Sequence, residues 1–331
     1  MNFDIFNDDA FSLSQMTLAM NDLQHTPTML GEMGLFNEQG INTTSVMIEK
    51  VGQAFTLVPA AERGAPGRPV GNDKRSLRTF STVHLPQRGA VNADEVQNIR
   101  AFGTDTLLQT VQSLVNTKLQ KMRTNIDLTM EWQRMGAVKG QVLDADGTTV
   151  LLNLFSEFGV VQNTLDFGLD VDATKLKQKC LDLERMIEDE LDGIMFTDIL
   201  VLCSKEFYDA LVQHPAVVAA YDRYQDSVFL RTSQRKVDFE FAGIKFREYR
   251  GKVGAQRFIA AGEAYAVPAG VPDLFISRFA PGDYLETVNT IGLPYYAKQW
   301  VEPQGKRVEL ESQSNPLHML TRPRAVVKLS I

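Results

Sequence analysis

The stretch TDTLLQTVQSLVNTKLQKMRTNIDLTMEWQRM, residues 104–135, decides the fold. Apolar residues recur along it at steps of three and four, which is typical of a helix with one buried face. The residues we expect at the centre of that face are Leu107, Val111, Leu114, Met122 and Ile126. At about 1.5 Å per residue the helix is about 48 Å long, more than a typical globular helix. It therefore needs a long surface to lie on, and Gly136 and Gly140 predict its end.

Residues 46–91, upstream of this helix, predict a long β-hairpin. The segments SVMIEKVGQAFTLVP (45–59) and LRTFSTVHLP (77–86) are rich in strand-forming residues, and glycines and prolines interrupt the sequence between them. Each arm of about 13 residues would reach about 40 Å at about 3.3 Å per residue. Apolar side chains occur on both faces of the arms, and a two-stranded ribbon by itself is marginal in water. We therefore expect a further surface to support the hairpin.

The first 45 residues contain acidic side chains but neither Lys nor Arg. They also carry scattered apolar residues, so we expect this segment to lie along a surface, either of its own domain or of a neighbour. A loosely packed extension is the alternative. The acidic residues that we expect to make subunit contacts are Asp4, Asp8, Asp9 and Asp22.

The hairpin tip and its flank are predominantly basic. The residues that we expect to make subunit contacts there are Arg63, Arg68, Lys74, Arg75 and Arg78. Two extensions of opposite charge on one chain suit contact between copies, because complementary potentials fix register and speed encounter. A solvated basic loop is the alternative.

The rest of the chain alternates between helical and extended patterns. Asn92 and Glu95 have the spacing of a helix N-cap and its partner, and Asp146-Gly147 predicts a hairpin turn. The further elements that we expect are an amphipathic helix at 174–191, a central strand at 198–204, helices at 205–225 broken at Pro215, and a strand-rich region from 237 onward. This mixture predicts the α+β fold class.

Composition excludes several classes of protein. The 331 residues have a net charge of −7, whereas a protein that grips duplex DNA normally has a basic surplus. A mildly anionic container for DNA is still compatible with this charge. The sequence contains no run of 18 or more apolar residues, so it predicts no membrane span. The acidic N-terminus does not resemble a secretory signal. Cys180 and Cys203 form no C-x-x-C pair, which fits a reducing cytoplasm.

Candidate chemistry is sparse. The histidines fall in four separate regions without metal-ligand spacing, and they are His25, His84, His214 and His318. The Asp144-x-Asp146-Gly147 stretch begins like a calcium loop but lacks the closing Glu, so a tight turn explains it better. No nucleophile elbow, phosphate-binding loop or dinucleotide fingerprint occurs. We therefore expect no catalytic residue, no metal site and no cofactor, and hence no enzyme.

Four C-terminal segments carry a family resemblance. They are FAGIKFREYRG (241–251), GEAYAVPAGVPDLF (262–275), APGDYLETVNTIGLPYYAKQW (280–300) and LESQSNPLHMLTRPRAVV (310–327). These segments resemble the phage major capsid protein E family, the group of the lambda-type head protein. The acidic N-terminus, the Gly/Pro-tipped hairpin and the long helix follow in that family's order, so the resemblance covers nearly the whole chain.

The resemblance implies the Hong Kong 97-type capsid fold and a division of the chain into five parts. They are an N-arm (1–45), an extended loop (46–91), a peripheral domain with the spine helix (92–159), an axial domain (160–285) and a return to the peripheral domain (286–331). The hairpin would then overlap an adjacent subunit.

The implied function is that of the major capsid protein of a tailed bacteriophage. Copies would form hexamers and pentamers of an icosahedral shell around a double-stranded DNA genome, which the shell contacts non-specifically. Expected partners are a scaffolding protein and a portal during assembly. Lambda-type heads are reinforced by a decoration protein, and the sequence leaves open whether one binds this chain. Assembly would be noncovalent and would take place in the host bacterial cytoplasm, away from membranes. The alternative with the same fold is an encapsulin-like nanocompartment, and a more distant alternative is an enzyme with a site built from dispersed carboxylates.

Overall fold

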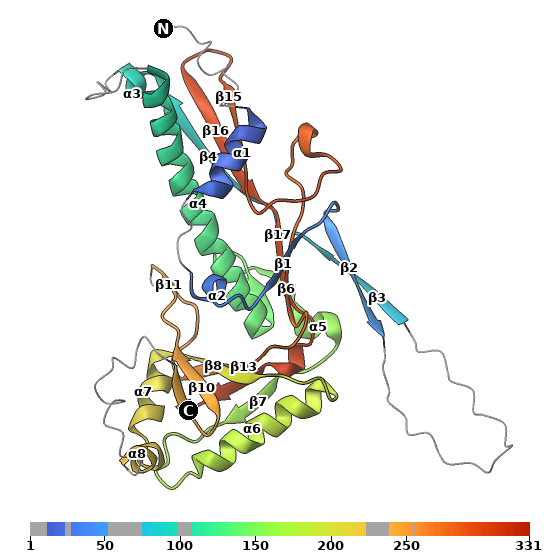
Figure 1. Cartoon of the computed structure of the whole chain (residues 1–331), viewed down its shortest axis with the longest axis vertical. Coiled ribbons are helices and arrows are strands. Elements are labelled where there is room, and N and C mark those ends of the chain that lie inside the picture. The colour runs from blue at the N-terminus through green and yellow to red at the C-terminus, as the bar shows by residue number, and fades with distance from the viewer. Residues whose placement is uncertain (1–11, 24–27, 52–74, 98–106, 223–237, 255) are drawn as a thin grey trace, which may run out of the picture.

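The computed structural model describes residues 12–23, 28–51, 75–97, 107–222, 238–254 and 256–331. The molecule is elongated, with two units stacked along its length (Figure 1). The upper unit contains the long helix and a narrow sheet, and the lower unit contains a wider sheet flanked by helices. A two-stranded hairpin projects sideways between them. The predicted hairpin tip and the start of the N-arm lie outside the described residues.

Helix α4 (Leu107–Lys139) confirms the predicted long helix and runs one turn further than the sequence suggested. Gly140 follows it with a φ of +83°, the left-handed conformation that commonly ends helices. Gly136, expected to end the helix, lies inside it instead. A Cβ atom there would come within 2.9 Å of the Cα atom of Val142, so glycine lets strand β5 (Gln141–Leu143) pass close to the helix.

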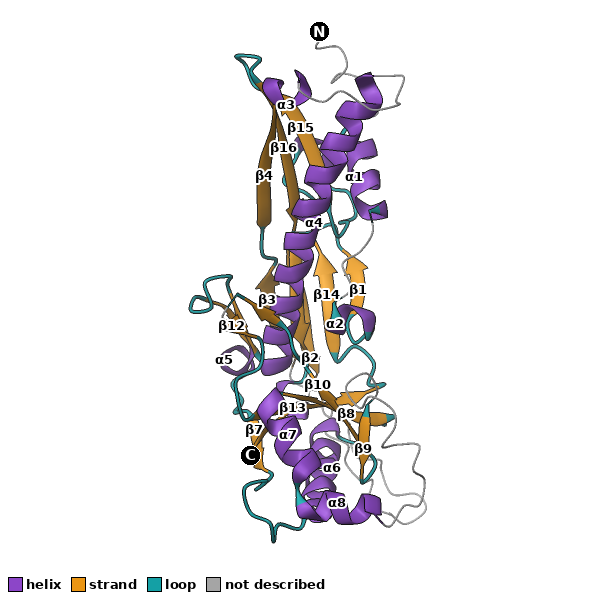
Figure 2. Ribbon diagram, turned by 90° about the vertical axis from the view of Figure 1, so that its left-hand side faces the viewer, coloured by secondary structure: helices purple, strands orange, loops and turns teal. Residues whose placement is uncertain are grey.

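The upper unit packs α4 against a three-stranded antiparallel sheet. The order of its strands is β15 (Tyr296–Val301), β16 (Arg307–Ser314) and β4 (Leu85–Asn92). Helix α1 (Leu13–Asp22) lies beside α4 and contacts β15 (Figure 2). The apolar cluster between these elements includes Met16, Met20, Val115, Leu119, Met122, Ile126 and Leu310.

A small sheet lies between the two units. Its strands are β1 (Asn37–Gly40), β14 (Phe275–Phe279) and β17 (Pro316–Leu320), with β1 parallel and β17 antiparallel to the central β14. The short helix α2 (Met29–Glu32) precedes β1 and contacts α4. Residues 28–40 of the N-terminal segment therefore lie on their own chain.

The lower unit is built on a six-stranded mixed sheet. Its strands in order are β7 (Asn163–Asp166), β18 (Val327–Ser330), β13 (Glu263–Ala269), β8 (Asp198–Cys203), β10 (Ile244–Glu248) and β9 (Phe239–Phe241). The predicted central position of β8 is confirmed by its pairing with β13 and β10. The helices of this unit, α6 (Leu176–Leu191), α7 (Lys205–Gln213) and α8 (Pro215–Asp222), match the predicted helices and the predicted break at Pro215.

The hairpin pairs β2 (Ser45–Val51) with β3 (Arg75–Ser81) in antiparallel register. The prediction of one return arm over 77–86 was wrong in its second half. The chain leaves the hairpin after Ser81, and the following strand, β4, pairs with β16 in the upper sheet.

Shorter elements complete the fold. They are α3 (Ala93–Gln97), β6 (Val150–Asn153), α5 (Leu154–Phe158), β11 (Lys252–Val253), β12 (Gln256–Arg257), and the 3-10 turns Leu285–Thr287 and Pro323–Ala325. Helix α3 begins one residue after Asn92, whose side-chain amide donates to Glu95 at 3.0 Å. The last 46 residues contribute β15 and β16 to the upper sheet and β18 to the lower one.

Candidate subunit-contact surfaces

The hairpin has one covered face and one exposed face. Alternate residues of a strand point to opposite faces, and the register places Val46, Ile48 and Phe80 on one of them. Phe80 is buried, and its ring centroid lies 5.9 Å from that of Phe158 in α5, while Val46 and Ile48 pack against the same core. On the opposite face Met47 and Leu77 are 65% and 62% exposed. The subunit therefore covers the inner face and leaves two large apolar side chains, those of Met47 and Leu77, uncovered on the outer face.

The basic residues predicted at the hairpin tip are only partly described. Arg63, Arg68 and Lys74 lie outside the described residues, and Arg75 begins β3 without a described side chain. Arg78 lies on the inner face, with its guanidinium carbon 5.7 Å from the centroid of the Phe158 ring. Its aromatic contact is within its own chain, and a role for the tip in contacts with a neighbour remains a prediction.

The N-terminal segment, where it is described, lies on its own subunit. The Thr17 hydroxyl and the backbone of Ala297 in β15 contact each other twice, at 3.3 and 3.4 Å. The Asn21 side chain donates to the carbonyl oxygen of Tyr295 at 3.1 Å. Of the four acidic residues predicted here, Asp22 is exposed at the end of α1, and Asp4, Asp8 and Asp9 lie outside the described residues.

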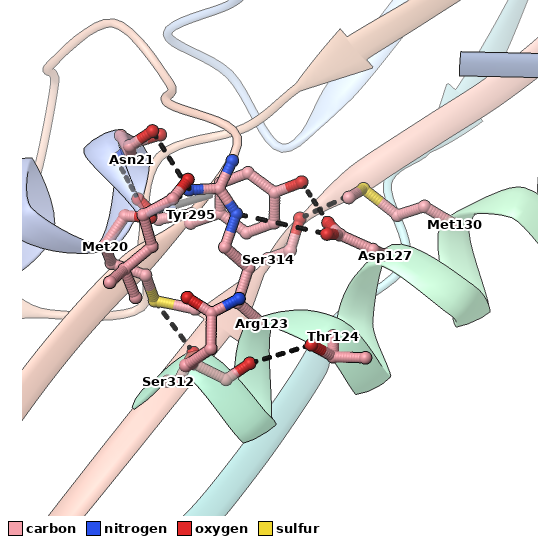
Figure 3. Close-up of polar contacts among 11 residues, drawn as sticks. Met20, Asn21, Arg123, Thr124, Asp127, Met130, Tyr295, Ser312 and Ser314 are labelled. Carbon is pink, nitrogen blue, oxygen red and sulfur yellow. Dashed lines mark hydrogen bonds and ion pairs between the residues drawn. The ribbon is translucent and has the colours of Figure 1, made fainter. Parts of the chain in front are cut away.

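Arg123 of α4 anchors the end of α1 (Figure 3). Its guanidinium donates to three backbone carbonyl oxygens, those of Met20, Asn21 (3.0 Å) and Leu23 (2.6 Å). It also lies 4.7 Å from the centroid of the Tyr295 ring and 3.9 Å from the carboxylate of Asp127. The Tyr295 hydroxyl donates a hydrogen bond to Asp127, and burial raises the pKa of that hydroxyl above its ordinary value. Because Arg123 and Asp127 are buried, these contacts are stronger than they would be at the surface, and they hold the helix end in one position.

Glu131 and Arg134 continue this arrangement about two and three turns beyond Arg123 along α4. One oxygen of Glu131 accepts from the backbone amide of Leu30 in α2 and from the Tyr249 hydroxyl, both at 2.8 Å. Burial, together with the adjacent Glu131 carboxylate, holds the pKa of Tyr249 well above its ordinary value. Arg134 pairs with Glu38 of β1. The N-terminal segment is thus tied to α4 at three successive points.

The residues predicted for the apolar face of the helix differ in burial. Met122 and Ile126 are buried, Leu114 is half-buried, and the side chains of Leu107 and Val111 are not described. The sequence reasoning missed the buried polar residues beside this face, which are Arg123, Asp127, Glu131 and Arg134. Their steps of four, four and three place them on one side of the helix, and this spacing was the available signal.

The remaining candidate residues lie in a turn or in the apolar core. The Asp146 carboxylate accepts from the backbone amides of Thr148 and Thr149, both at 2.9 Å, so the tight turn is confirmed. A hydrogen bond from the Thr149 hydroxyl, together with those two backbone amides, lowers the pKa of Asp146. Burial raises the pKa of the Cys180 thiol to about 12 and that of Cys203 well above its ordinary value. Among the residues that the structure describes, no group of three His, Cys, Asp or Glu side chains could hold a metal ion. Within the same residues, no helix is both long and apolar enough to cross a membrane.

A long helix on a narrow sheet, a compact mixed-sheet unit and a projecting hairpin are the features of the Hong Kong 97-type capsid fold. Solved structures share this fold. A candidate capsid protein of an Escherichia coli CFT073 prophage superposes with a TM-score of 0.62 at 14% identity, over 96% of this chain and 98% of that one. The capsid of Myoviridae phage XM1 gives a TM-score of 0.51 at 13% identity, over 93% of each chain.

Sequence relatives then give the family. The family model for phage major capsid protein E matches residues 12–331. The major capsid protein of Pseudomonas phage KPP10 is 30% identical, over 96% of each chain. That of Salmonella phage Felix O1 is 25% identical, over 96% of this chain and 95% of the relative. The chain belongs to the phage major capsid protein E family, and its function is that of a major capsid protein of a tailed phage.

Proposed function

We propose that copies of this chain assemble into hexamers and pentamers that close into an icosahedral shell around double-stranded DNA, with each hairpin covering part of an adjacent copy. The observation that carries this proposal is the two-faced hairpin. Phe80 on its inner face is buried, whereas Met47 and Leu77 remain exposed on the outer face. Apolar surface on a projecting ribbon is stabilised when a partner removes it from water.

The same proposal assigns the rest of the chain to the domains expected from the sequence. Residues 1–45 act as the N-arm, 46–81 as the extended loop, 92–159 with most of 286–331 as the peripheral domain, and 160–285 as the axial domain. Two strands change place relative to the sequence prediction, because β4 joins the peripheral sheet and β18 joins the axial sheet. The contacts of Arg123, Glu131 and Arg134 support an arm that stays with its own subunit over residues 12–23 and 28–40.

We further propose a purely mechanical role, without catalysis or a cofactor. Scaffolding protein and portal would act during assembly in the host cytoplasm, and a decoration protein would bind the finished shell. The subunits would be held together noncovalently. Shells boiled in detergent should then run as a monomer band on a denaturing gel, and a ladder of multimers would contradict noncovalent assembly.

Deleting residues 60–76 tests the role of the hairpin. This change removes the tip and the first two residues of β3 but leaves Val46, Ile48 and Phe80 on the covered face. We expect a subunit with the circular dichroism spectrum of the unaltered chain that forms no closed shells in negative-stain microscopy. A matched control replaces residues 60–74 with a Gly/Ser segment of equal length, which keeps the reach of the hairpin but not its side chains. Shells of normal size from the deletion would refute the proposed hairpin function.

A further inference from the structure

A second apolar surface lies on the loop of residues 281–294, between β14 and β15. Its exposed aliphatic side chains are Leu285 (91% exposed), Val288 (61%), Ile291 (72%) and Leu293 (41%). Single exposed aliphatic residues are common on soluble proteins, whereas larger exposed apolar patches are typical of interaction sites. We call residues 285–293 the apolar loop.

Hydrogen bonds hold the apolar loop in one conformation. The buried hydroxyl of Thr287 donates to the carbonyl oxygen of Gly282 at 2.6 Å, and that of Thr290 donates to the carbonyl oxygen of Thr287 at 2.7 Å. The backbone amide of Leu293 donates to the Tyr296 hydroxyl at 2.9 Å. Because the backbone is fixed in this way, covering the loop would cost little further ordering.

The base of the apolar loop is joined to the root of the hairpin. Ile41 donates its amide to the carbonyl oxygen of Phe279 and accepts from the amide of Gly292, both at 2.8 Å. A Cβ atom on Gly40 would lie 2.1 Å from the carbonyl oxygen of Gly292, so the segments meet at backbone contact. Strand β2 begins four residues after Ile41. The loop and the hairpin also project from the same side of the molecule (Figure 1).

We infer that the apolar loop is a subunit-contact surface whose occupant is a second copy of this chain. The inference rests on the proposed function, because it takes the outer face of the hairpin as the neighbouring part of the same interface. Apolar side chains would form the centre of this contact and the charged groups its rim. Glu286 is a charged group beside Leu285 that could lie at such a rim. Its carboxylate is paired with Lys298 of its own chain at 2.5 Å.

Photocrosslinking in assembled shells identifies the occupant. The variant Val288→p-benzoylphenylalanine is assembled, irradiated and digested, and the crosslinked peptides are identified by mass spectrometry. We expect a peptide from a second copy of this chain. Crosslinks only to another virion protein, or none at all, would overturn the inference. Failure of the unaltered chain to form shells would refute the proposed function instead.

A double variant measures how much the contact matters. Leu285→Asp with Ile291→Asp places two charges in the proposed contact, and we expect an unchanged subunit fold with a yield of closed shells at least about tenfold lower. The control Val161→Asp introduces a charge at a position that is 82% exposed and distant in sequence from the loop. A normal yield from the double variant, or an equal loss from the control, would overturn the inference.

Discussion

Arg123 is the residue that connects the N-terminal segment most directly to the body of the subunit. Replacing it with Met preserves much of the side-chain length but removes the donors to three carbonyl oxygens and the charge facing Asp127. Because breaking a buried ion pair leaves the partner charge uncompensated, we expect Arg123→Met to lower the free energy of unfolding by about 3–5 kcal/mol. Urea denaturation followed by circular dichroism measures this change.

Arg185 provides the matched control for that variant. It forms an ion pair with Asp182 at 3.5 Å on the surface of α6, where both side chains are largely exposed. Arg185→Met should change the free energy of unfolding by at most about 1 kcal/mol. Equal effects of the two substitutions would contradict the anchoring role given to Arg123.

The buried position of His318 predicts that the free energy of unfolding depends on pH. Its ring is buried between Phe36 and Phe279, and Nδ1 lies 2.7 Å from the Ser277 hydroxyl. Burial, and to a lesser extent Arg134, lowers the pKa of His318 well below its ordinary value. The folded chain therefore keeps this ring neutral, whereas the unfolded chain binds a proton below a pH of about 6.5. The stabilisation that comes from keeping His318 neutral is fully present above that pH. Below it, the free energy of unfolding falls by up to about 1.4 kcal/mol per pH unit.

The variant His318→Asn isolates this contribution, because it removes the titrating ring. We expect the loss of unfolding free energy between pH 7.5 and pH 5.5 to be smaller in His318→Asn than in the unaltered chain, by about 1 kcal/mol. Denaturant titrations at the two pH values provide the measurement. The same loss in both chains would show that other groups cause the pH dependence.

At the scale of elements, the two faces of the hairpin should respond differently to substitution. Phe80→Ala empties a buried position beside Phe158, and we expect it to lower the free energy of unfolding by about 3–5 kcal/mol. Met47→Glu adds a charge to the outer face and should change subunit stability by no more than about 0.5 kcal/mol. We expect Met47→Glu nevertheless to reduce the yield of shells in microscopy. An unstable Met47→Glu subunit would contradict the exposed outer face.

Local patterns predicted most elements but not all their partners. The periodicity from Leu107 to Met130 was sufficient for α4, because one face of a helix is set by residues near each other in the sequence. The division of LRTFSTVHLP between β3 and β4 was missed, since it depends on pairing of β4 with β16, more than 200 residues away. A strand pattern does not specify its partner.

At the scale of the whole molecule, the sequence left open which surface the N-terminal segment covers. Its acidic and apolar composition suited either its own domain or a neighbour. The deciding contacts pair Thr17 with Ala297 and Leu30 with Glu131, and neither pair is close in sequence. The buried polar side of α4 was missed for a related reason, because charged residues at helical spacing usually mark a solvated face. The groups that cover it come from α1, α2, β1, Tyr249 and Tyr295, which the helix sequence does not contain.

The two units of the subunit should also differ in stability. The upper cluster is the smaller of the two and adjoins the buried polar contacts of Arg123 and Asp127, whereas the lower cluster includes the sheet around β8 and β13. Regions with less apolar burial open at lower free energy. We therefore expect amide hydrogens of β4, β15 and β16 to exchange through partial opening in unassembled subunits, while those of β8 and β13 exchange only on global unfolding. Native-state hydrogen exchange followed by mass spectrometry measures both. Equal protection of the two sheets would mean that α4, which contributes to both clusters, makes the subunit one cooperative unit.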